Sequence, residues 1–129
     1  RSARYGLGGR VQFCHADFAV DLAMHGQFDL ILSNPPYIPS SDIDMLDADV
    51  RHFDPLAALD GGVDGLDCWR ILCPQMAILL ADRGAAFVEI GAGQGKAVRM
   101  LGAASKLRVV DSFADLSGHE RCLQFQKEI

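Results

Sequence analysis

The sequence predicts an α/β fold, a doubly wound and mainly parallel sheet whose ligands bind at the carboxyl ends of the strands. Short apolar runs alternate with stretches of helical spacing, which indicates strands joined by helical crossovers. The last two predicted strands follow one another closely, so we expect an antiparallel hairpin at an edge of the sheet. Half of the 129 residues are hydrophobic, which is enough for the core of one domain.

The first part of the chain predicts one short strand. Residues 1–9 are typical of a helix end followed by a glycine-rich turn, and residues 11–14 alternate as a strand does. Residues 21–26 indicate a helical turn or a loop. These elements lead into the clearest strand signal of the chain.

That signal is the run Leu30-Ile31-Leu32, which predicts a buried strand over residues 28–33. The segment that follows, residues 38–55, is polar and acidic. We expect it to be a surface excursion with a helical piece over residues 41–48, which Ser41 is suited to cap.

Helical spacing dominates from residue 66. A stripe of apolar residues predicts a helix as far as residue 81, and Pro74 is expected to kink or split it. Asp82-Arg83-Gly84 is typical of a helix end. The remaining predicted elements are a buried strand over residues 85–90, a helix over residues 96–105, and strands over residues 107–113 and 121–127.

Composition and charge argue against several classes of protein. The formal net charge is −5 and the basic residues are scattered, which disfavours a nucleic-acid-binding face. No apolar run approaches the roughly 18 residues of a membrane span, and no run has the form of a signal peptide, so we expect a cytoplasmic protein. The four cysteines and four histidines lack the paired spacing of a metal site, and we expect free thiols.

The motif Asn34-Pro35-Pro36-Tyr37 follows the 28–33 strand and is suited to holding a planar NH2 group. The two N–H donors of such a group need two acceptors, which the Asn34 side-chain oxygen and the Pro35 carbonyl supply. The prolines fix φ and remove competing N–H donors, while Tyr37 offers a flat face to the substrate. The motif therefore predicts methyl transfer to nitrogen, without naming the substrate.

Four segments carry a resemblance to a known family: FDLILSNPPYIP, DVRHFDPLAALDGGVDGLDCWRIL, AAFVEIGAGQG and ADLSGHERCLQF. In this order and spacing they resemble the catalytic domain of the release factor glutamine N5-methyltransferases. The resemblance implies a Rossmann-like class I methyltransferase sheet. It also implies transfer of a methyl group from S-adenosylmethionine to a glutamine amide in the Gly-Gly-Gln loop of a peptide-chain release factor.

The resemblance also implies roles for single residues at the substrate. Asn34 and Pro35 are expected to hold the glutamine amide and to be the catalytic pair. Pro36 and Tyr37 are expected to complete the substrate pocket.

For the cofactor, the resemblance points to Asp17 and Phe18, which stand where the family contacts the adenine. Asn34 is also expected to face the cofactor. Asp54 stands where the family usually has Glu, and it receives no role.

The chain departs from the family at its front. Neither the glycine-rich cofactor loop nor the acid that ends the second strand precedes Asn34. We therefore interpret residues 1–129 as the C-terminal part of a catalytic domain, with an incomplete sheet that leaves one edge of the 28–33 strand unpaired. We expect this part alone to bind S-adenosylmethionine weakly or not at all, to be inactive, and to self-associate.

Two other interpretations remain open. Gly91-Ala92-Gly93-Gln94-Gly95 follows a strand and precedes a helix, as the cofactor loop of a permuted DNA amino-methyltransferase does, with Asp111 as the ribose-binding acid. Against this, little sequence follows the loop to complete such a sheet, and the acidic segment 38–55 is unsuited to DNA. The third interpretation is a noncatalytic α/β interaction module, in which Glu89 and Gln94 are polar residues at a strand end and nothing more.

Overall fold

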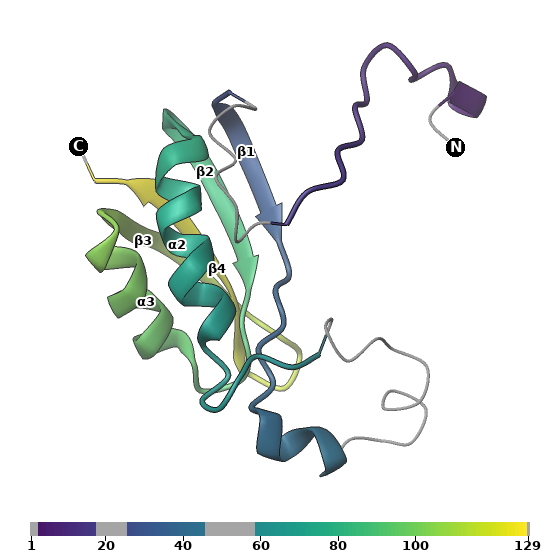
Figure 1. The fold of residues 1–129 in the computed structure, drawn as a ribbon. Coiled ribbons are helices and arrows are strands. Elements are labelled where there is room, and N and C mark those ends of the chain that lie inside the picture. Colours follow the sequence, from purple (N-terminus) through teal and green to yellow (C-terminus); the bar gives the residue numbers. More distant parts are fainter. Residues whose placement is uncertain (1–2, 18–25, 46–58, 129) are drawn as a thin grey trace.

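A computed structural model describes residues 3–17, 26–45 and 59–128 of the chain. These residues form a four-stranded mixed sheet with two α-helices packed against it, so the predicted α/β class is confirmed (Figure 1). The elements in chain order are η1 (Ala3–Tyr5), β1 (Phe28–Ser33), η3 (Ser40–Met45), α2 (Asp67–Leu79), β2 (Leu80–Glu89), α3 (Gly95–Ala104), β3 (Leu107–Ala114) and β4 (Glu120–Lys127).

The order of the strands in the sheet is β1-β2-β4-β3. β1 and β2 are parallel and are joined through α2, while β4 is antiparallel to both β2 and β3. The predicted C-terminal hairpin at a sheet edge is thereby confirmed. β1 forms the other edge, and its carboxyl end lies at the same end of the sheet as that of β2.

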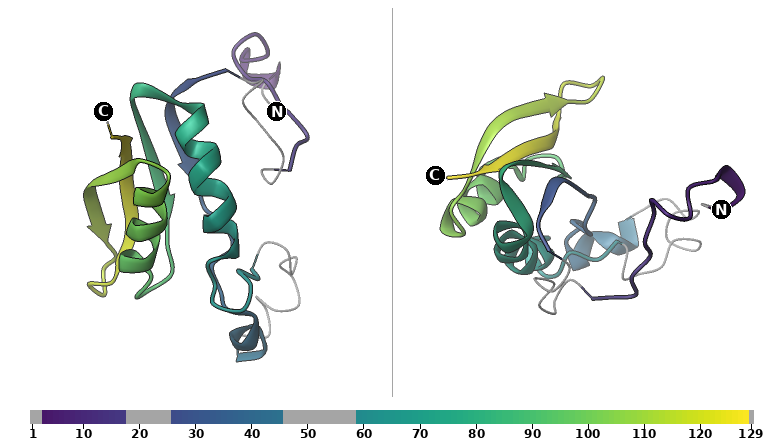
Figure 2. Two further views of the ribbon diagram at one scale, coloured as in Figure 1. Left: turned by 60° about the vertical axis from the view of Figure 1, so that its left-hand side comes forward. Right: turned by 90° about the horizontal axis from the view of Figure 1, so that it is seen from above.

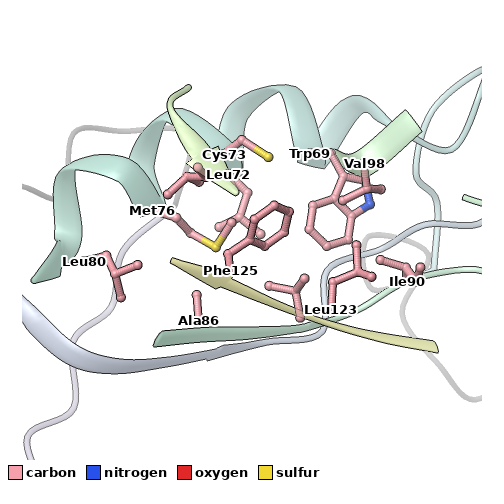
Figure 3. Close-up of a cluster of buried hydrophobic side chains, with 12 residues drawn as sticks. Trp69, Leu72, Cys73, Met76, Leu80, Ala86, Ile90, Val98, Leu123 and Phe125 are labelled. Carbon is pink, nitrogen blue, oxygen red and sulfur yellow. The ribbon is translucent and has the colours of Figure 1, made fainter. Parts of the chain in front are cut away.

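The hydrophobic core lies between the sheet and the two helices (Figure 3). α2 contributes the apolar stripe that its spacing predicts, and β2 and β4 contribute alternate residues, as strands with one covered face do. The buried side chains of these elements include Trp69, Leu72, Cys73, Met76, Ala86, Val88, Leu123 and Phe125. α3 lies so close to β4 that a Cβ on Gly102 would meet the Phe125 ring.

Both helices cover the same face of the sheet, so the doubly wound arrangement is wrong for the described residues (Figures 1 and 2). β1 is correspondingly not the buried strand that its apolar run predicts, because Leu30 is 56% exposed and Leu32 is 71% exposed. A continuous apolar run is typical of a strand covered on both faces, and the described residues cover only one.

The predicted strand over residues 11–14 is wrong. This segment pairs with none of the described strands, and Phe13 is 81% exposed. A short alternating segment becomes a strand only where a neighbour accepts its backbone hydrogen bonds. The helix end and turn predicted over residues 1–9 correspond to η1 and the turns after it. The prediction over residues 21–26 lies, apart from Gly26, outside the described residues.

The helical piece predicted over residues 41–48 corresponds to η3, and its last three residues lie outside the described part of the chain. The predicted helix over residues 66–81 is not split, because α2 continues through Pro74 as one element and ends at Leu79. The other predicted helix and strands correspond to α3, β1, β2, β3 and β4.

Asp82-Arg83-Gly84 belongs to β2 rather than to a helix end. Leu80, the first residue of β2, is fully buried in the core and has an extended backbone with φ −79° and ψ 130°, so the helix has already ended there. A Cβ on Gly84 would lie 2.8 Å from the carbonyl oxygen of Phe28, so glycine allows the two backbones to pass closely. The pairing of β1 with β2 shifts register at this point.

Candidate functional site

The loop that leaves the carboxyl end of β1 consists of Asn34, Pro35, Pro36 and Tyr37. Asn34 is exposed, Pro35 is buried, and the last two residues are half-buried. Because proline fixes φ, the exposed amide of Asn34 stands on a stiff and partly buried base. This placement suits a side chain that meets a substrate.

Tyr37 is anchored to the end of the neighbouring parallel strand. Its hydroxyl donates a hydrogen bond to Oε1 of Glu89, the last residue of β2, at 2.9 Å. Burial raises the pKa of the Tyr37 phenol, and the hydrogen bond to the Glu89 carboxylate raises it further. The phenol therefore stays protonated and continues to donate at neutral pH.

The Gln94 side chain forms hydrogen bonds with three segments of the chain. Its Nε2 donates to the carbonyl oxygen of Tyr37 at 3.0 Å and to that of Gly65 at 3.3 Å. Its Oε1 accepts a hydrogen bond from the backbone N–H of Gly91 at 2.9 Å. The loop after β1, the loop before α2 and the turn after β2 thus meet at one side chain.

The segment before α2 lies against the same loop. Ile38 and Asp60 form a parallel β-bridge, with the Gly61 N–H donating to the Ile38 carbonyl at 2.7 Å. A Cβ on Gly61 would lie 2.9 Å from the carbonyl carbon of Tyr37. Asp60 in turn accepts hydrogen bonds from the Ser40 hydroxyl and the Gly62 N–H. The glycines of this segment therefore allow backbone to pack on backbone.

An open cleft of about 620 Å³ lies beside Tyr37. It is lined by residues 37–39 and 91–94 and by the side chains of Asp42, Asp64 and Arg121. Arg121 comes from β4, where its Nε is 3.3 Å from the carboxylate of Asp115. The cleft combines apolar lining residues with side chains of both signs of charge.

The predicted cofactor residues are only partly placed. Asp17 is exposed, and its charge contributes, after burial and the charge of Asp67, to the raised pKa of the Cys68 thiol, so Asp17 lies near the start of α2. Phe18 and Asp54 lie outside the described residues. The cleft beside Tyr37 is lined by neither Asp17 nor Asn34. The expected contacts of Asp17, Phe18 and Asn34 with S-adenosylmethionine therefore stay predictions.

Two of the glycines in the 91–95 segment, Gly91 and Gly95, make room for side chains of the protein itself. A Cβ on Gly91 would lie 2.9 Å from Oε1 of Gln94 and 2.9 Å from Cδ2 of Tyr37, and one on Gly95 would meet the Glu120 carboxylate. Asp111 lies within β3, which β4 separates from β2. Packing within the chain therefore accounts for Gly91 and Gly95, and a cofactor loop over residues 91–95 stays an untested alternative.

Sequence reasoning missed the roles of Glu89 and Gln94 as anchors of Tyr37. Both lie within the AAFVEIGAGQG segment that carries the resemblance, but nothing in one sequence reveals that they contact a residue more than 50 positions earlier. Within the described residues no group of three His, Cys, Asp or Glu side chains could hold a metal ion, and no helix there is long and apolar enough to cross a membrane.

A parallel β1-α2-β2 unit with the Asn34 loop at its carboxyl end, completed by a helix and an antiparallel hairpin, is part of a Rossmann-like methyltransferase sheet. No protein-family profile matches the chain. The chain is, however, similar in sequence to proteins named release factor glutamine methyltransferase. Those of Rhodospirillum rubrum and Bradyrhizobium diazoefficiens are 51% and 47% identical to it over 124 residues, and that of Caulobacter vibrioides is 42% identical over 120.

These matches cover 93 to 95% of the chain, so over almost its whole length the chain is a homologue of the release factor glutamine methyltransferases. The chain spans about two fifths of the length of these relatives, between 38 and 41%.

Proposed function

We propose that this chain supplies the substrate-holding part of a methyltransferase that modifies the side-chain amide nitrogen, N5, of a glutamine in a peptide-chain release factor. The observation that carries the proposal is the stiff Asn34-Pro35-Pro36-Tyr37 loop at the end of β1, anchored through Tyr37 to Glu89 and Gln94. The relatives are named release factor glutamine methyltransferases, which supports the same substrate.

The chemistry needs two acceptors at the amide. An amide nitrogen is a poor nucleophile because its lone pair is delocalised into the carbonyl group. Hydrogen bonds from its two N–H groups to the Asn34 side-chain oxygen and the Pro35 carbonyl favour a pyramidal nitrogen whose lone pair points away from both acceptors. S-adenosylmethionine, when bound, supplies the electrophilic methyl group. The residues of this chain act by orientation, and no strong base is required.

The cofactor and partner follow from the same proposal. Asp17 and Phe18 are proposed to contact the adenine of S-adenosylmethionine, and Asn34 to lie between cofactor and substrate. The protein partner is proposed to present a Gly-Gly-Gln loop, and the site of action is the cytoplasm, where release factors work.

A functional test uses a chimera, because the chain spans only 38% of the Rhodospirillum rubrum relative. Residues of that relative that match this chain are replaced by this chain, and transfer of labelled methyl to a release factor is measured. The proposal expects activity from the chimera, none after Asn34→Ala, and nearly unchanged cofactor binding. Asn34→Asp keeps the size and the acceptors but adds charge, so it separates shape from electrostatics. Close to full activity after Asn34→Ala would refute the two-acceptor grip.

We further propose that these 129 residues alone bind S-adenosylmethionine weakly or not at all, transfer no methyl group, and self-associate through the β1 edge. The exposure of Asn34 and the unpaired edge of β1 support this. Calorimetric titration of the isolated chain tests the first part, and micromolar binding of the cofactor would contradict it.

A further inference from the structure

We propose that Gln94 is a positioning residue, which fixes the Asn34-Pro35-Pro36-Tyr37 loop in the orientation that substrate binding needs. The inference rests on the proposed function, because it assigns Gln94 to the same site. Gln94 itself touches no reacting atom. It acts through the backbone carbonyl of Tyr37.

The contacts of Gln94 use both ends of its amide. The Nε2 group donates to the Tyr37 and Gly65 carbonyls, and Oε1 accepts from the Gly91 N–H. Each of these partners belongs to a different loop at the carboxyl end of the sheet. Because the Gln94 amide donates and accepts in fixed directions, it fixes the positions of the three loops relative to one another.

Two glycines make the space that this amide occupies. A Cβ on Gly65 would lie 2.8 Å from Nε2 of Gln94, and a Cβ on Gly91 would lie 2.9 Å from Oε1. Gln94 is also fixed at its base, because its carbonyl accepts the Val98 N–H at the start of α3. The half-buried amide is therefore enclosed by its partners on a residue that is fixed as the N-cap of α3.

The Asn34 loop depends on where Tyr37 is held. Proline fixes φ at positions 35 and 36, so the loop turns mainly about its two ends. β1 fixes the first end, and Tyr37 fixes the second through its hydroxyl on Glu89 and its carbonyl on Gln94. Releasing the carbonyl lets the Pro35 oxygen and the Asn34 amide drift from the positions that two acceptors must share.

The substitution Gln94→Glu tests this with almost no change of shape. A carboxylate still accepts from the Gly91 N–H, but it has no N–H to donate to the Tyr37 and Gly65 carbonyls. Its negative oxygen is instead repelled by the partial negative charge on these carbonyl oxygens. Gln126→Glu is the matched control, because Gln126 is also half-buried but belongs to the far end of β4.

Both variants are made in the chimera, and kcat is measured at saturating cofactor and release factor. Misplacement of a reacting group by about 1 Å lowers rates by up to about a hundredfold. We expect Gln94→Glu to lower kcat at least tenfold, with KM for S-adenosylmethionine changed less than threefold and the urea midpoint shifted no more than in the control. We expect Gln126→Glu to keep wild-type kcat.

A second readout uses the 129-residue chain and does not depend on activity. The Ile38 and Gly61 amides donate across the bridge beside Tyr37, whereas the Ile90 amide donates to Arg121 on the other side of the sheet end. Gln94→Glu is expected to speed hydrogen exchange of the first two amides about tenfold and to leave the third unchanged.

The outcomes separate the two proposals. Wild-type kcat in Gln94→Glu, or unchanged exchange at Ile38 and Gly61, overturns the positioning role. A loss of kcat that merely follows an equal loss of stability overturns it as well. An inactive chimera before any substitution refutes the proposed function, and the exchange experiment then still decides whether Gln94 holds the loop.

Discussion

Tyr37 is held at both of its polar ends, and this has a measurable consequence for its phenol. Burial raises the pKa of Tyr37 above its ordinary value of 10.0, and the Glu89 carboxylate raises it further. With Tyr5→Phe removing the only other tyrosine, the phenolate absorbance of the chain reports Tyr37 alone. We expect Glu89→Gln to lower the pKa of Tyr37, while burial keeps it above 10.0.

The control for this titration is Glu128→Gln, which removes an exposed carboxylate beyond the end of β4 and should leave the curve in place. If Tyr37 titrated at the same pH with and without Glu89, the hydroxyl would not be anchored as the structure has it.

At this scale the sequence predicts residues for a substrate site but not the residues that hold them in place. Asn34, Pro35, Pro36 and Tyr37 are consecutive, so the motif can be recognised from the sequence. Glu89 and Gln94 act on Tyr37 from 52 and 57 positions away, and only the sheet brings them there. No spacing rule in a single sequence encodes such a contact.

At the scale of the elements, an ion pair between Arg99 of α3 and Glu120 of β4 links the helix to the strand. Nη1 and Nη2 of Arg99 each donate to the Glu120 carboxylate at 2.8 Å, and these hydrogen bonds lower the pKa of Glu120 to about 2. Because the pair is about one-third exposed, we expect Glu120→Gln to lower the free energy of unfolding by only about 0.5–1 kcal/mol at neutral pH.

The effect of that substitution should depend on pH. A carboxylate whose pKa is lowered in the folded state stabilises above its unfolded pKa, near 4.5, and loses this contribution as the pH falls to about 2. Urea unfolding of wild type and Glu120→Gln should therefore converge between those values. Asp82→Asn, which removes a looser pair with Lys127 at 3.7 Å, serves as the control with little effect at any pH. A constant difference across the range would contradict the assignment.

The start of β2 is one place where element prediction failed, and the cause there is tertiary. Asp82-Arg83-Gly84 has the composition of a helix end, but burial of Leu80 and the close passage of Gly84 beside β1 draw the segment into the sheet. Local composition cannot register either contact. The hairpin and α3, by contrast, depend mainly on local patterns, and their prediction is confirmed.

Gly84→Ala tests this account of the strand start. The added Cβ would lie 2.8 Å from the Phe28 carbonyl oxygen and 2.9 Å from a methyl of Leu80, and the backbone cannot withdraw cheaply. We expect a loss of about 1–3 kcal/mol in the free energy of unfolding. Gly8→Ala, where a Cβ meets nothing within 4 Å, is expected to be neutral. Equal stability of the two variants would show that β1 and β2 do not pass so closely.

For the whole molecule, the exposed side of the sheet matters most. Phe28, Leu30, Leu32 and Phe113 are all between 43 and 71% exposed, and among the described residues β1 pairs with a neighbouring strand on one side only. Sequence alone predicts the unpaired edge, because the resemblance places a further strand beside the 28–33 segment. The sequence does not predict that the sheet face opposite the helices is exposed. An apolar run predicts a strand buried on both faces, whether or not other elements pack on the second face.

An apolar edge strand with free backbone groups tends to pair with another copy. We therefore expect the isolated 129-residue chain to sediment as dimers or larger species, increasingly so with concentration. Leu30→Lys together with Leu32→Lys puts two charges on that strand and should shift the chain to monomer without lowering its urea midpoint, because both side chains are largely exposed. Met100→Lys, on a 65% exposed position of α3, should leave the association unchanged. A wild-type chain that remained a monodisperse monomer would show that the β1 edge does not drive self-association.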